Sequence, residues 1–155
     1  MDIDSLLRRP AYQLADLVRA KKVSSFELVS AAIEKAKAEN PQLNAVIHLR
    51  EKSALNEARQ LTDHGQPFLG VPILIKGLGQ QLAGEPDTNG NKLFQNNVAQ
   101  ATNNFVRALQ QAGFIIIGQT NFPEFGWKNI TDAKLFGPAR NPWNTAVTPG
   151  GSSVG

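Results

Sequence analysis

The chain of 155 residues contains no cysteine, which excludes disulfide bonds, zinc–thiolate sites and a cysteine nucleophile. Long apolar runs are also missing. The stretches at residues 69–75 and 114–117 fall well short of the roughly 18 residues that a membrane-spanning helix needs. The first ten residues, MDIDSLLRRP, lack the apolar region of a signal peptide. We therefore expect a cytoplasmic protein with no membrane partner.

The sequence has no cluster of charge of one sign. The net charge is +3, from 16 Lys and Arg against 13 Asp and Glu. The basic residues are scattered, and Arg8-Arg9 and Lys21-Lys22 are only pairs. A nucleic-acid-binding domain needs a clustered basic face, so we expect no nucleic-acid partner.

The first third of the chain has the patterns of helices. Ser24 and Glu27 have the spacing of a capping box, and apolar residues follow at helical intervals. We expect this helix to end at Asn40-Pro41. The segment NAVIHL is then typical of a short strand, and residues 51–62 of another helix. Residues 1–65 are thus predicted to form a mainly helical layer.

The pattern changes at Gly70, where GVPILIKG is a compact apolar run bounded by turn residues, as in a buried strand. A long polar loop follows up to about residue 101. We expect Thr102 to cap the next helix and Gly113 to end it. The buried face of that helix is predicted to contain Phe105, Val106, Leu109 and Ala112. FIIIG predicts a second buried strand, and this order of elements favours a parallel β–α–β unit in an α/β fold.

Lys76 directly follows the apolar run ILI, at the carboxyl end of the first of these strands. Ligands of open α/β sheets bind at that edge. An apolar setting lowers the pKa of a lysine, and a lysine that is neutral near pH 7 can act as a general base. The alternative is a lysine that leaves the sheet and reaches solvent, and position alone favours this alternative.

The segment GGSSVG, residues 150–155, is the second candidate for chemistry. Glycines allow a close backbone approach to a ligand, and serine hydroxyls can donate, accept or relay protons. The plain alternative is a polar turn. A third interpretation is a phosphate-binding loop, because Gly150 and Gly155 have the spacing of its two glycines. The preceding NPWNTAVTPG is a poor strand to lead into such a loop.

The remaining candidates are weaker. His48 and His64 have no partners at metal-ligand spacing, and we place His48 on a strand face. Glu124 is interpreted as a charge at a helix N-terminus rather than as an acid. Trp127 and Trp143 are expected to pack in the core rather than to line a pocket.

Three segments resemble one family when taken together. They are GVPILIKG, then GFIIIGQTNFPEFG, then GPARNPWNTAVTPGGSSVG. In order and spacing, over residues 70–155, they are similar to the motifs of the amidase signature hydrolases. The resemblance implies an N-terminal helical layer followed by part of the mixed, mostly parallel sheet of an α/β/α sandwich. Residues 1–155 would be a single, incomplete domain of this kind, with residues 66–155 as its β–α–β part.

The resemblance also implies roles for individual residues. Lys76 matches the lysine base of the family, and Ser152 matches its bridging serine, which has a cis peptide bond in the family. Gly150, Gly151 and Ser153 would shape the catalytic turn. The nucleophilic serine is expected roughly two dozen residues beyond Ser152 in this family, outside these 155 residues. The substrate would be a small-molecule amide, with no metal and no cofactor.

Two positions depart from the family pattern. The family usually has Asp after the lysine, where this chain has Gly77, and it reads GGSSGG where this chain has Val154. The loss of a carboxylate at Gly77 removes a group that could orient the neighbouring backbone. A β-branched residue is a poor substitute at a position that needs a positive φ.

These observations predict the N-terminal fragment of an amidase that is inactive by itself, because its nucleophile is missing. The alternatives are a non-catalytic binding module, half of a split enzyme that pairs with a C-terminal fragment, and a phosphate-binding domain. The visible residues select neither a particular amide nor an oligomeric state.

Overall fold

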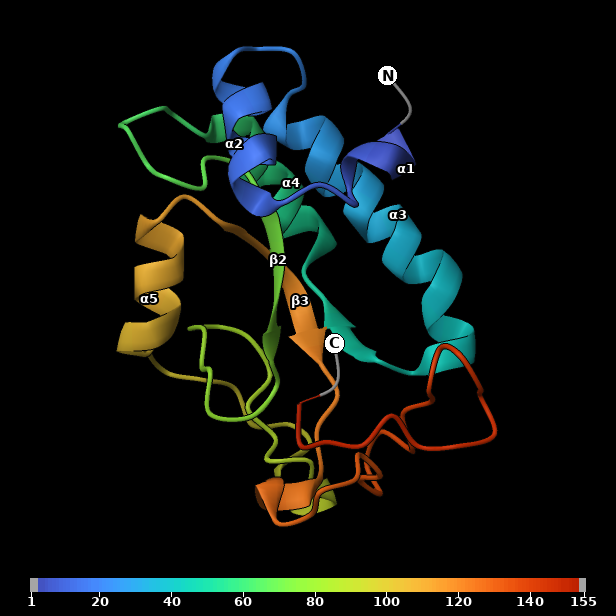
Figure 1. Ribbon diagram of the computed structural model, residues 1–155. Coiled ribbons are helices and arrows are strands. Elements are labelled where there is room, and N and C mark those ends of the chain that lie inside the picture. Colours follow the sequence, from blue (N-terminus) through green and yellow to red (C-terminus); the bar gives the residue numbers. More distant parts are fainter. Residues whose placement is uncertain (1–2, 154–155) are drawn as a thin grey trace.

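The computed structural model describes residues 3–153, which form a small mixed sheet with helices on both of its sides (Figure 1). The α-helices are α1 Ile3–Leu6, α2 Ala11–Arg19, α3 Ser25–Leu43, α4 Glu51–Gln60 and α5 Asn104–Gln111. The strands are β1 Val46–Leu49, β2 Pro72–Lys76 and β3 Ile115–Thr120. Two short 3-10 helices are η1 Lys92–Phe94 and η2 Glu124–Gly126. The predicted α/β class is confirmed.

The sheet has the order β1-β3-β2. β2 and β3 run parallel and β1 runs antiparallel to β3, so the predicted parallel β–α–β unit is confirmed. The short strand of the helical third thus joins the same sheet. A side chain at Gly118 would overlap the carbonyl group of His48, which explains why β3 carries a glycine where β1 passes.

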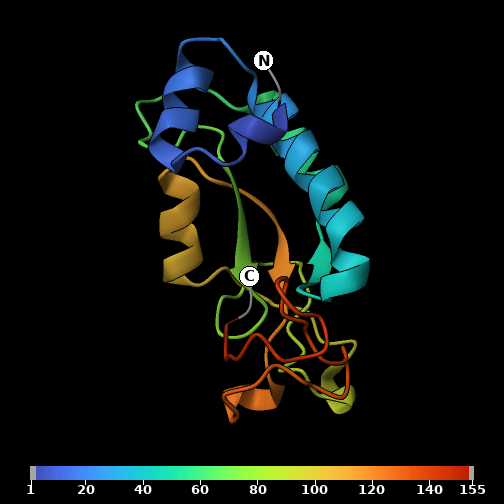
Figure 2. The same cartoon turned by 45° about the vertical axis from the view of Figure 1, so that its right-hand side comes forward.

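Both faces of the central strand are covered, as Figure 2 shows with α5 on one side of the strands and α3 on the other. Ile115 and Ile117 pack against α3 and α4, whereas Ile116 packs against Val106 of α5. A strand buried on both faces is expected to be continuously apolar, which accounts for the run FIIIG.

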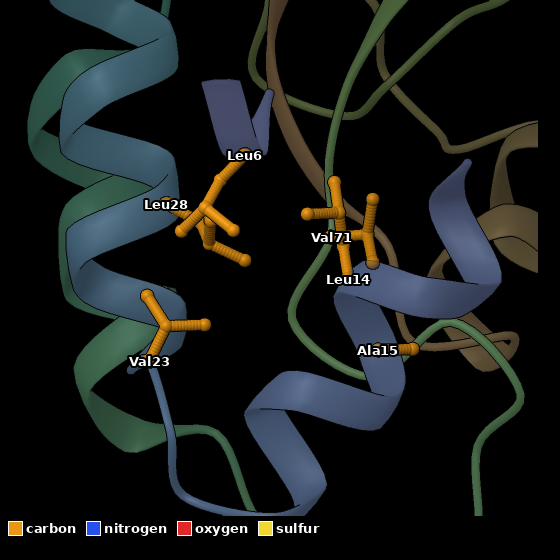
Figure 3. Packing of buried hydrophobic residues seen from close by; sticks show 6 residues of the cluster. All are labelled: Leu6, Leu14, Ala15, Val23, Leu28 and Val71. Atoms are coloured by element: carbon orange, nitrogen blue, oxygen red, sulfur yellow. The ribbon is translucent and has the colours of Figure 1, made fainter. Parts of the chain in front are cut away.

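A further apolar cluster joins α1 and α2 to the rest of the molecule (Figure 3). Leu28 of α3 and Val71, just before β2, contribute to this cluster, and both side chains are buried. Its remaining buried members are Leu6, Leu14, Ala15 and Val23. The helical third is therefore packed onto the chain segment that enters β2.

The capping box at the start of α3 is confirmed, with Glu27 N donating to Ser24 Oγ at 3.1 Å and Ser24 N donating to Glu27 at 2.7 Å. The predicted end of this helix was wrong, because α3 continues through Pro41 to Leu43. Pro41 lies in the last turn, where the loss of one N–H donor interrupts little. The helix ends at Asn44, whose φ of 50° is left-handed.

The start of α5 also differs from the prediction. The cap is Asn103, whose side chain accepts from Val106 N at 2.9 Å, while Thr102 Oγ1 accepts from Ala83 N. Phe105 was predicted to be buried and is exposed, because the face of α5 that meets the sheet centres on Val106. Gly113 ends the helix as expected, with a φ of 98°.

Residues 121–153 contain no strand and only η2 as a helical element. They lie beyond the carboxyl ends of β2 and β3, as the orange and red ribbon of Figure 1 shows. The prediction of core tryptophans was wrong, since Trp127 is 86% and Trp143 91% exposed. Both indoles lie in this region of turns, and no helix or strand within residues 3–153 covers them. Within residues 3–153, no helix is long and apolar enough to cross a membrane.

Candidate active site

Lys76 is the last residue of β2 and pairs with Thr120 of β3. Its position therefore follows from the parallel pairing of the two apolar strands. The side chain is half-buried, and this burial lowers the pKa of Lys76 because an apolar setting disfavours the charged ammonium. The amide nitrogen of Lys76 donates to Gln80 Oε1 at 2.6 Å.

Ser152 approaches Lys76 from the far end of the chain. Lys76 Nζ donates a hydrogen bond of 2.7 Å to Ser152 Oγ, across 76 positions of sequence. The peptide bond between Gly151 and Ser152 is cis, as the resemblance implied. The structure thus brings together the two residues that the sequence predicted as a pair.

The turn that carries Ser152 has limited space for side chains. Gly150 has a φ of 90°, and its amide donates to Thr148 Oγ1 at 3.1 Å. A Cβ atom at Gly151 would lie 3.0 Å from Thr131 Oγ1, which is closer than ordinary contacts allow. Ser153 is exposed next to Ser152. Val154, the second departure from the family pattern, lies outside the described residues.

The space beside Gly77 is already occupied. A side chain at this position would overlap the ring of Phe122 and lie 2.9 Å from Ile47 Cδ1. Phe122 is fully buried. The ring of Phe122 therefore occupies the space that a carboxylate side chain after Lys76 would need.

A polar cluster next to the sheet was not predicted from the sequence. Arg50 Nε donates to Glu85 Oε1 at 2.6 Å, and its Nη2 donates to Glu57 Oε1 at 2.7 Å. His48 Nε2 forms a contact of 2.7 Å with Glu85 Oε2. Burial would raise the pKa of Glu85, but the hydrogen bonds from Arg50 and His48 outweigh it and lower that pKa. This cluster fixes the long loop after Lys76 to the end of β1.

The other candidates have structural surroundings. His48 lies on β1, as expected, and makes its contact with Glu85. Glu124 begins η2 and accepts a hydrogen bond from Asn91. No strand leads into Gly150, so the phosphate-loop interpretation lacks the element it needs. Within residues 3–153, no three His, Asp or Glu side chains gather as metal ligands.

Gln80 and Thr131 were also missed by the sequence analysis. Gln80 holds the backbone of Lys76, and Thr131 lies against Gly151 with a buried hydroxyl. A glutamine in a polar loop and a threonine in a turn carry no linear signal of such contacts. Gln80 reaches Lys76 through the turn that directly follows β2, and Thr131 reaches Gly151 through the loop region after β3.

The family model for amidases matches residues 27–155. This chain therefore belongs to the amidase family, also called the amidase signature family, which agrees with the pairing of Lys76 and Ser152.

Particular relatives extend this result. A lipoamidase of Enterococcus faecalis is 62% identical over 145 residues, which are 94% of this chain and 20% of the relative. The solved structure of a 6-aminohexanoate cyclic dimer hydrolase is 36% identical, with a TM-score of 0.88 over 95% of this chain and 30% of its own. A fatty acid amide hydrolase structure, 21% identical with a TM-score of 0.91 over 99% of this chain and 28% of its own, supports the fold alone. The chain spans between a fifth and a third of the length of these relatives.

Proposed function

We propose that this chain supplies two members of a Ser–Ser–Lys relay in an amidase that hydrolyses a carboxamide C–N bond. Lys76 is the base and Ser152 the bridging serine. The observation that carries the proposal is the 2.7 Å contact between Lys76 Nζ and Ser152 Oγ, formed by a strand end and a loop that are distant in sequence. Membership of the amidase family supports the same assignment.

The chemistry of the relay follows from the protonation of Lys76. Burial lowers the pKa of Lys76, which increases the fraction of neutral amine available at moderate pH. The neutral amine accepts the proton of Ser152, and Ser152 accepts the proton of a nucleophilic serine. That serine attacks the amide carbonyl, the proton passes back to the departing amine, and water hydrolyses the acyl-enzyme.

The third member of the relay is proposed to come from the part of the enzyme outside residues 1–155. Apart from Ser152 and Ser153, every serine of the chain lies within residues 5–53, in the helical part. In this part Ser24 caps α3 and Ser25 Oγ donates to the carbonyl of Gly70. Without the third member of the relay, residues 1–155 alone would not hydrolyse amides. Residues 1–65 and 66–155 would be two parts of one amidase domain.

The relatives suggest which substrate to test first. The 62% identity to a lipoamidase makes lipoamide the first probe. A cyclic dimer of 6-aminohexanoate is a second probe, since a hydrolase named for it is 37% identical to this chain and a 36% identical hydrolase of this name has been solved with its substrate.

The test is complementation. The 155-residue chain is co-expressed with the Enterococcus faecalis lipoamidase from which the matching segment has been removed, and release of ammonia from lipoamide is measured. We expect hydrolysis by the pair and none by the chain alone. Lys76→Met and Ser152→Ala should each abolish hydrolysis, whereas Ser53→Ala, at an exposed serine of α4, serves as the matched serine control and should retain it.

Each other result has a defined meaning. Turnover by the chain alone contradicts the missing nucleophile. Stable association without turnover favours the non-catalytic binding module. Hydrolysis that survives Lys76→Met in a co-purified pair contradicts the role of Lys76.

A further inference from the structure

The backbone of Lys76 is held by a side chain from the loop that follows it. Gly77 N donates to Thr120 O at 3.1 Å, toward β3. Successive amides of a strand point to opposite sides, so the Lys76 N–H points away from β3. There it donates to Gln80 Oε1 at 2.6 Å. Gln80 thus provides the acceptor that no neighbouring strand provides within residues 3–153.

Gln80 itself lies in a turn that is tied to α5. Asn103 Nδ2 donates to Gly79 O at 2.7 Å, and Asn103 N donates to Gln81 O at 3.0 Å. The oxygen of the same side chain caps α5 by accepting from Val106 N. α5 packs on the sheet through Val106. The turn that contains Gln80 is therefore connected both to α5 and to the end of β2.

A side chain at position 77 cannot be the acceptor for the Lys76 amide, because it would overlap Phe122. The residue next to the lysine therefore contributes only its backbone, and Gln80 is the side chain that bonds the Lys76 amide.

We propose that Gln80 is a positioning residue that fixes the end of β2 and thereby directs Lys76 Nζ onto Ser152 Oγ. The inference rests on the proposed function for the catalytic role of Lys76 and Ser152, whereas the hydrogen bonds of Gln80 do not depend on that function. Removing the acceptor of a half-buried N–H is destabilising, and this would loosen the strand end. Displacements of about 1 Å in a catalytic group cost roughly a hundredfold in rate.

The experiment uses the 155-residue chain and two readouts at Lys76, both by NMR. Hydrogen exchange of the Lys76 amide reports the bond to Gln80. Titration of the Lys76 side chain reports whether the amine keeps its buried position. The variants are Gln80→Leu and Gln80→Asn, of which the second stays polar but is one methylene shorter. Gln100→Leu is the matched control, because Gln100 is exposed and, within residues 3–153, bonds only the carbonyl of Val98.

In Gln80→Leu and Gln80→Asn we expect amide exchange at Lys76 to become about tenfold faster, as the loss of one hydrogen bond implies. The pKa of Lys76 should rise toward 10.5, because the freed amine reaches solvent. Gln100→Leu should change neither. A purely structural role for Gln80 would lower the free energy of unfolding without moving the pKa of Lys76 in the folded chain.

Gln80→Glu keeps the acceptor and should restore slow exchange of the Lys76 amide, which is scored without the titration because the new carboxylate itself acts on Lys76. An unchanged pKa of Lys76 in both Gln80→Leu and Gln80→Asn overturns the inference, whether or not amide exchange becomes faster. If one of these variants fails to fold, the other decides the outcome. Neither readout requires amide hydrolysis, so failure of the complementation assay leaves this result standing, and the reverse also holds.

Discussion

The sheet with its surrounding helices and the loop region of residues 121–153 are held together by different forces. On β3, Ile116 and its neighbours are buried on both faces. In the loop region, Phe122 is buried, but Trp143 is 91% exposed, and links such as Arg140 N donating to Leu43 O at 2.7 Å are polar. The proposed relay joins one member from each region. The lysine comes from the well-packed part, and the serine comes from the part with less packing.

This difference predicts that the largest loss of stability follows a change in the sheet. Ile116→Ala removes a side chain that packs between β3 and α5 and is 1% exposed. Deleting such a group costs the lost burial plus a cavity, about 3 kcal/mol. Urea denaturation followed by circular dichroism measures it. A loss below about 1 kcal/mol would show that the sheet is not the packed part of the molecule.

The next largest effect is expected in the polar cluster that ties the long loop to the sheet. Arg50→Met leaves Glu85 half-buried without its main partner and removes the bond from Nη1 to Ile116 O. We expect a loss of about 2 kcal/mol in the free energy of unfolding. Arg50→Lys should rescue little, since one ammonium cannot replace a guanidinium that bonds three groups. Full rescue by lysine would contradict the assigned geometry.

A smaller, pH-dependent effect follows from the lowered pKa of Glu85. The unfolded chain takes up this proton first as the pH falls. The stabilisation by ionised Glu85 is therefore complete above the ordinary value of 4.5 and is lost as the pH falls through the lowered folded pKa. The difference in unfolding free energy between the wild type and Glu85→Gln should shrink on acidification. A constant difference across that window would rule out the titration of Glu85 as its source.

The smallest effect is expected at the exposed indole. Trp143→Ala should change the free energy of unfolding by no more than about 0.5 kcal/mol, because little of the side chain is buried. The same urea titration serves here, with Ile116→Ala as its counterpart in the core. A loss of more than about 1 kcal/mol would mean that the loop region is packed in a way that the structure does not have.

The sequence predicted the sheet better than the loops, for a physical reason. A continuous apolar run such as FIIIG is typical of a strand buried on both faces, and a capping box specifies its own helix start. The end of α3 at Leu43, beyond Pro41, was missed because a proline in the last turn removes only one bond. Phe105 and the two tryptophans were placed in the core by residue type, which ignores which face finds a partner.

The candidate site divides in the same way. The pairing of Lys76 with Ser152 was expected from motifs in a fixed order, and the structure brings the two side chains into contact. Arg50 and Glu85 were not expected, because their contact is set by the path of a long loop, and Gln80 was not expected, because a glutamine in a polar loop has no pattern that marks a bond to a backbone amide. No local pattern records a contact between positions 50 and 85.

The most direct test of the account is the titration of the Lys76 side chain by NMR in the wild-type chain. We predict a midpoint below 10.5, because burial at the end of β2 disfavours the ammonium. Ile116→Ala, which loosens the sheet, should move that midpoint upward, and Trp143→Ala should leave it unchanged. A midpoint at or above 10.5 in the folded chain would contradict Lys76 as the base of the relay.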